Sequence, residues 1–123
     1  MNIGGVHLTR IGSDDMLLEP TRALDISDTG TLLESILECL QREKSLRLYY
    51  DLAEMAVIDP VYFAWLENLS RACRAINVRI ICIHMQPTAA FGLATFLHAA
   101  PSFETALDMQ SLREVEFPGF SGG

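Results

Sequence analysis

The most constraining stretch of the chain is residues 78–83, VRIICI, an almost unbroken apolar run. A run of this kind is typical of a parallel strand that other elements cover on both faces. A helical pattern precedes it, and residues 45–52, SLRLYYDL, form another strand-like stretch before that helix. Strand, helix and strand in this order predict a right-handed βαβ unit and an α/β domain.

The helix inside this unit is predicted to begin at the stretch VIDPVYF. Asp59 can cap the helix, and Pro60 suits its first position because the N–H that proline lacks would have no partner there. Asn77 can end the helix. The predicted buried face follows helical spacing and contains Phe63, Leu66, Leu69, Cys73 and Ile76.

Further elements are predicted on the N-terminal side of this unit. Residues 6–11 and 16–19 flank the turn-rich segment GSDD, which predicts an antiparallel hairpin. Residues 31–44 follow helical spacing, and Thr31 with Glu34 has the form of a capping box. A hairpin and an amphipathic helix are therefore expected before the βαβ unit.

On the C-terminal side, a third helix is predicted after the turn HMQPT, with Ala90, Leu93 and Leu97 on one face. FETALDM predicts a last strand or extended segment, and QSLREVE predicts a short terminal helix. The whole order predicts an open, mostly parallel sheet of four to five strands, with about four helices packed on it.

Composition and charge narrow the functions of such a domain. With 123 residues the chain forms one domain, and a net charge of −7 argues against nucleic acid as a partner. No apolar run approaches about 18 residues and no leader opens the chain, which predicts a cytoplasmic protein without membrane insertion. Three cysteines without metal-ligand spacing, Cys39, Cys73 and Cys82, indicate neither a metal site nor a disulfide framework.

The candidate chemistry lies at the carboxyl ends of the predicted parallel strands, where open α/β sheets bind ligands. This edge brings together the stretches 59–62 and 84–88, and Asp59 is expected near His84. No Ser or Cys nucleophile and no Gly-rich phosphate loop accompanies them, so we expect neither catalytic residues nor a cofactor. Phe63 is expected in the core, whereas Tyr62 and Trp65 are expected to be exposed and to serve a homodimer or partner face.

These residues resemble a known family. The element order, the strand LYYDLAEMAVID running into a helix, and the later IHMQPTAAFGLATF are similar to the STAS domain, the anti-sigma factor antagonist fold. The likeness is greatest to the single-domain stressosome scaffold of the RsbS type, and includes ETALDMQSL. It implies a STAS domain over residues 1–116, and the Gly- and Pro-containing residues 117–123 predict a flexible tail.

In that family the residue after the Asp is usually Ser or Thr, and an ATP-binding kinase phosphorylates it to change partner choice. Here that residue is Pro60, which has no hydroxyl, so the resemblance implies a degenerate phosphosite. The family commonly has Gly where this chain has His84, which puts in doubt how closely a partner approaches the backbone. Where related stressosome proteins carry a second phosphorylatable Thr, this chain has Gly92.

The resemblance therefore implies a non-enzymatic regulatory module in stress-response or sigma factor signalling. Its expected partners are an anti-sigma or switch kinase of the ATP-binding type, or other STAS chains. A STAS subunit of a transport complex that docks on an ATPase, and a small-ligand sensor using the Asp59 and His84 edge, stay open as alternatives. The expected partner-binding residues are Asp59, Pro60, Val61, Tyr62, His84, Gln86 and Thr88.

Overall fold

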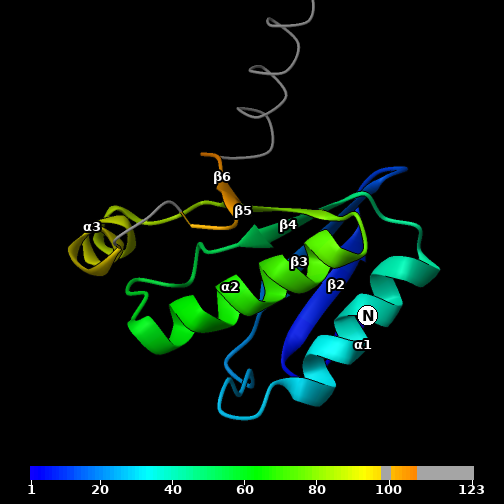
Figure 1. Ribbon diagram of the computed structural model, residues 1–123, viewed down its shortest axis with the longest axis horizontal. Coiled ribbons are helices and arrows are strands. Elements are labelled where there is room, and N and C mark those ends of the chain that lie inside the picture. The colour runs from blue at the N-terminus through cyan, green and yellow to red at the C-terminus, as the bar shows by residue number, and fades with distance from the viewer. Residues whose placement is uncertain (98–100, 108–123) are drawn as a thin grey trace, which may run out of the picture.

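The computed structural model describes residues 1–97 and 101–107. In that part of the chain, one six-stranded sheet and three helices alternate along the sequence (Figure 1). The strands are β1 (Asn2–Ile3), β2 (Val6–Arg10), β3 (Asp15–Pro20), β4 (Arg47–Asp51), β5 (Arg79–Ile83) and β6 (Glu104–Thr105). The helices are α1 (Gly30–Arg42), α2 (Pro60–Ala75) and α3 (Pro87–Phe96).

The strands lie in the sheet in the order of the chain, β1 to β6. β1, β2 and β3 pair antiparallel, and β3, β4, β5 and β6 pair parallel. The N-terminal hairpin and the mostly parallel sheet are confirmed, but the expected four to five strands are too few. The additional strand is β1, which joins β2 through Gly4 and Gly5, both with positive φ, and is too short to show a period in the sequence.

α1 and α2 lie side by side over one face of the sheet (Figure 1). Residues 80–83 of β5 are all buried, as expected for a strand covered on both faces. Ile80 and Cys82 belong to the main core beneath the helices, whereas Ile81 and Ile83 belong to a second cluster with Tyr49. The terminal helix in QSLREVE and the boundary between residues 116 and 117 lie outside the described residues.

α2 begins and ends as expected, and Leu66, Leu69 and Cys73 of its predicted buried face are buried, but the buried face also extends to other residues. Its buried side chains include Tyr62 and Trp65, which are 7% and 3% exposed, so their expected exposure is wrong. Phe63 and Ile76 are only half-buried. Two overlapping apolar stripes run along this helix, and the stripe with the larger aromatic area faces the core.

Two smaller predictions are also wrong. α1 begins at Gly30 after Thr29 and has no side-chain cap, so Thr31 and Glu34 form no capping box. In α3 the buried residue is Ala89 rather than Ala90, together with Leu93, whereas Leu97 is half-buried.

Candidate functional site: the carboxyl edge of the sheet

β4 and β5 end at the same edge of the sheet because they are parallel and in register, with Asp51 opposite Ile83. From this edge the chain enters α2 through residues 52–59 and enters α3 through residues 84–86. The fold therefore brings together the two stretches that the sequence predicts as a site.

The start of α2 has a specific cap. Asp59 has extended backbone geometry, and its Oδ1 accepts a hydrogen bond from the Tyr62 N–H at 2.8 Å. Pro60 occupies the first helical turn, and Asp59, Pro60 and Val61 are exposed. Val57 and Val61 are 64% and 62% exposed, which places two apolar side chains on solvent on either side of the cap.

Tyr62 anchors this helix start from inside the protein. Its hydroxyl lies 2.5 Å from the hydroxyl of Tyr50, and the Trp65 Nε1–H donates to the Tyr50 hydroxyl at 3.0 Å. Burial raises the pKa of Tyr62 to about 12 and raises the pKa of Tyr50 well above its usual value. The side chain of Tyr62 therefore supports the edge from within the core.

His84 lies directly after β5 and has a φ of 59°, in the left-handed region. Its Nδ1 lies 3.0 Å from Oδ1 of Asp51, the residue that ends β4. The sequence prediction pairs His84 with Asp59, but the hydrogen-bonded carboxylate is Asp51. The alignment of strand ends is the signal that identifies Asp51, because parallel neighbours place their last residues side by side.

Gln86 and Thr88 hold the loop between β4 and α2. Gln86 Nε2 donates to the Ala53 carbonyl at 2.6 Å, and Thr88 Oγ1 donates to the Ala56 carbonyl at 2.5 Å. Both bonds join segments more than 30 residues apart. These two predicted site residues therefore have a structural role, which is to fix the path of the chain that leads to Asp59.

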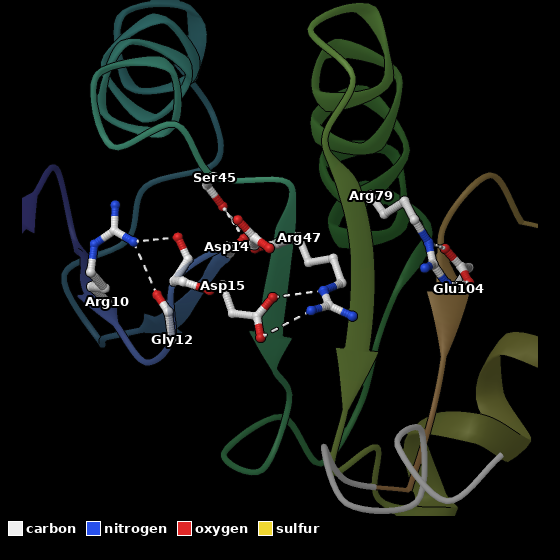
Figure 2. A network of polar contacts seen from close by, with 9 residues as sticks. Arg10, Gly12, Asp14, Asp15, Ser45, Arg47, Arg79 and Glu104 are labelled. Carbon is white, nitrogen blue, oxygen red and sulfur yellow. Dashed lines mark hydrogen bonds and ion pairs between the residues drawn. The ribbon is translucent and has the colours of Figure 1, made fainter. Parts of the chain in front are cut away.

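The opposite edge of the sheet is polar and internally paired. The first residues of β3 and β4 form an ion pair, with Arg47 Nε at 2.6 Å from Asp15 Oδ1. Arg79, the first residue of β5, pairs with Glu104 at 2.7 Å (Figure 2). This network was not predicted from the sequence. Leu46 is a large apolar side chain exposed beside this network, whereas Val57 and Val61 are exposed at the carboxyl edge.

The described residues give two further findings. Within residues 1–97 and 101–107, no three His, Cys, Asp or Glu side chains gather in a way that could hold a metal ion. None of the helices in the same part of the chain combines the length and apolar character that crossing a membrane requires.

Solved structures with the same fold include two stressosome-related proteins. A Ser-to-Glu variant of RsbS from Moorella thermoacetica has a TM-score of 0.69 at 19% identity, covering 94% of this chain and 97% of that chain. A chain of the stressosome, described as a signal integration and transduction hub, has a TM-score of 0.71 at 16% identity. The match covers 92% of this chain and 98% of that chain. The NMR structure of the protein TM1081 has a TM-score of 0.69 at 12% identity. The match covers 93% of this chain and 88% of that chain.

Sequence comparisons give no such match. No model of a known protein family matches the chain, and no curated protein does so. The likeness to the solved structures is one of fold, at identities of 12 to 19%, and it spans nearly the whole chain.

Proposed function

Because the chain has the RsbS-type STAS fold, we propose that it is a non-enzymatic regulatory module of the cytoplasm that binds protein partners through the carboxyl edge of its sheet. One observation carries the proposal: Val57 and Val61 are exposed on both sides of the capped start of α2. Exposed apolar side chains that lie together with polar neighbours are typical of protein-binding surfaces.

We name this surface the docking face, and both halves of the edge contribute to it. The loop and start of α2 provide its apolar part, and the segment from His84 to Thr88 provides its polar part. Tyr62 is not part of this surface and supports it through the core contacts that hold α2 in place. Its residues are Val57, Asp59, Pro60, Val61, His84, Gln86 and Thr88.

Binding at this face is constitutive, which means that it does not depend on phosphorylation at the start of α2. A phosphate at the start of α2 would add nearly two negative charges and three acceptor oxygens, but Pro60 has no hydroxyl to carry it. The nearby Thr88 hydroxyl is engaged with the Ala56 carbonyl. The position after Asp59 therefore keeps one charge state, and partner choice does not depend on its modification.

The partners are other STAS chains or an ATP-binding kinase of the anti-sigma type. The first is supported by the stressosome chain of the same fold, since a stressosome is an assembly. An exposed apolar face suits packing against another protein domain. The process served would be stress-response signalling through sigma factor regulation.

Affinity capture from the native lysate, with the bound proteins identified by mass spectrometry, tests this function. The expected result is recovery of STAS chains or an anti-sigma kinase. A Pro60→Ser variant in the same experiment should gain a phosphate at residue 60 that the wild-type chain does not carry. Recovery of a transport ATPase would contradict the regulatory role, and a stoichiometric phosphate on the wild-type docking face would contradict constitutive binding.

A further inference from the structure

A cavity of about 420 Å³ is lined by the loop after β3 and the loop after β4. The loop after β3 contributes Pro20, Leu24 and Ile26, and the loop after β4 contributes Met55. Tyr62 at the start of α2 completes the lining. Its volume lies within the range of about 300 to 1,000 Å³ that is usual for small-molecule sites, and most of this lining is apolar.

The hydrogen bonds of the buried tyrosine pair leave one hydroxyl hydrogen without an acceptor. Trp65 donates to the Tyr50 oxygen, and one hydrogen serves the contact between Tyr50 and Tyr62. The other hydroxyl hydrogen has no acceptor among the described residues. A buried donor without a partner costs about 1 to 3 kcal/mol, so the spare hydrogen belongs on the tyrosine that meets open space.

Tyr62 is that tyrosine, because it lines the cavity whereas Tyr50 is fully enclosed in the core. Tyr50 therefore donates to Tyr62, and the Tyr62 hydroxyl has a hydrogen to offer the cavity. The apolar wall thus contains one fixed donor from a side chain that is 7% exposed.

Arg22 and Glu54 also line the cavity, and both side chains are exposed. Neither has a hydrogen-bond or ion-pair partner through its side chain in the described part of the chain. The two opposite charges cancel, so the cavity favours a ligand without net charge over an anion or a cation.

We propose that this cavity binds a small uncharged molecule with an apolar body and one oxygen that accepts a hydrogen bond from the Tyr62 hydroxyl. Burial of the apolar body supplies the affinity, and the donor fixes its orientation. The site is separate from the docking face, although both share the loop between β4 and α2. The proposal does not depend on the proposed function.

Titration of the ¹⁵N-labelled full chain, followed by two-dimensional NMR, tests the proposal. Three probes share a six-carbon ring and differ in charge: cyclohexanone, cyclohexanecarboxylate and cyclohexylammonium. Cyclohexanone is expected to shift the amide resonances of Leu24, Ile26 and Met55 saturably. Both ions are expected to bind at least about fivefold more weakly, because an ion loses hydration in the apolar cavity and the cancelling charges of Arg22 and Glu54 do not replace it.

Three variants locate the binding. Tyr62→Phe keeps the ring and removes the donor, and should weaken cyclohexanone binding about fivefold, the worth of one hydrogen bond. Leu24→Trp should abolish binding by filling the cavity, whereas Leu46→Trp, at an exposed site on the opposite edge, should leave it unchanged. A dispersed spectrum for each variant confirms that it is folded.

Three results would overturn the proposal: no saturable shift with cyclohexanone, tighter binding of either ion, or equal cyclohexanone affinity in the wild type and in Tyr62→Phe. The same titration on Val61→Asp distinguishes ligand binding in the cavity from partner binding at the docking face. That substitution changes the docking face and is expected to leave cyclohexanone binding intact.

Discussion

His84 and Asp51 are hydrogen-bonded across the carboxyl ends of two neighbouring parallel strands, with 3.0 Å between Nδ1 and Oδ1. The same Asp51 oxygen accepts the Ala53 N–H at 2.9 Å, so one carboxylate orders both the histidine and the loop to α2. Because a carboxylate only accepts, the neutral imidazole has its hydrogen on Nδ1. In this tautomer Nε2 of the exposed His84 is a hydrogen-bond acceptor.

The left-handed backbone at His84 gives the first prediction. His84→Ala and His84→Gly both remove the bond to Asp51, but only glycine adopts a φ of 59° without strain. His84→Gly should therefore be more stable than His84→Ala by about 1 kcal/mol in urea unfolding. Equal stability of the two variants would show that this backbone geometry is not maintained in solution.

The cap at the start of α2 gives the second prediction. Asp59→Ala removes the acceptor for the Tyr62 N–H and should lower the free energy of unfolding by about 1 kcal/mol. Asp59→Asn is the matched control, because an amide oxygen caps nearly as well. A loss for Asp59→Asn as large as that for Asp59→Ala would contradict the capping role.

The buried tyrosine and thiol groups predict weaker folding at alkaline pH. Burial raises the pKa of Tyr62 to about 12, and also raises the pKa of Cys73 to about 12. In the unfolded chain these groups titrate near their ordinary values, about 10 for tyrosine and about 8.5 for cysteine. Their contribution to stability is therefore complete below about pH 8.5 and is lost as the pH rises towards 12.

Urea unfolding at intervals between pH 8 and 11 measures this loss, at roughly 1.4 kcal/mol per pH unit for each group that titrates. The slope should be shallower for Tyr62→Phe and for Cys73→Ala than for the wild type. A free energy of unfolding that stays constant to pH 11 would contradict the burial of both groups.

The hydrogen bonds that Gln86 and Thr88 donate to the loop between β4 and α2 give the fourth prediction. Thr88→Val removes the bond to the Ala56 carbonyl with little change in shape, and Gln86→Ala removes the bond to the Ala53 carbonyl. The double variant should exchange the amide hydrogens of residues 53–57 about thirtyfold faster, because each of the two lost bonds is worth about 1 kcal/mol locally. Unchanged exchange would show that other contacts hold this loop.

Much of the fold was predictable from the sequence, because the elements around the site follow strong local rules. The apolar run of β5 and the Asp–Pro start of α2 were both located correctly. The Gly4–Gly5 pair was a usable signal for the additional strand, since such a pair favours a two-residue hairpin. The capping box at Thr31 and Glu34 failed because the cap position of α1 is Thr29, two residues before Thr31.

The contacts within the site were less predictable, because they depend on packing between distant segments. Helical spacing alone does not predict which of the two overlapping stripes of α2 is buried. The hydrogen bond between Tyr50 and Tyr62 favours burial of the stripe that contains Tyr62 and Trp65. The carboxylate beside His84 depends on the register of β4 and β5, which no single segment encodes.

The affinity of one purified captured partner for two matched variants tests the docking face most directly. Val61→Asp places a charge on the docking face at a residue that is 62% exposed, and Leu46→Asp places the same charge on the opposite edge at a residue that is 53% exposed. Isothermal titration calorimetry should show binding at least about tenfold weaker for Val61→Asp and unchanged for Leu46→Asp. Equal binding of Val61→Asp and the wild type, or a loss confined to Leu46→Asp, would contradict the account.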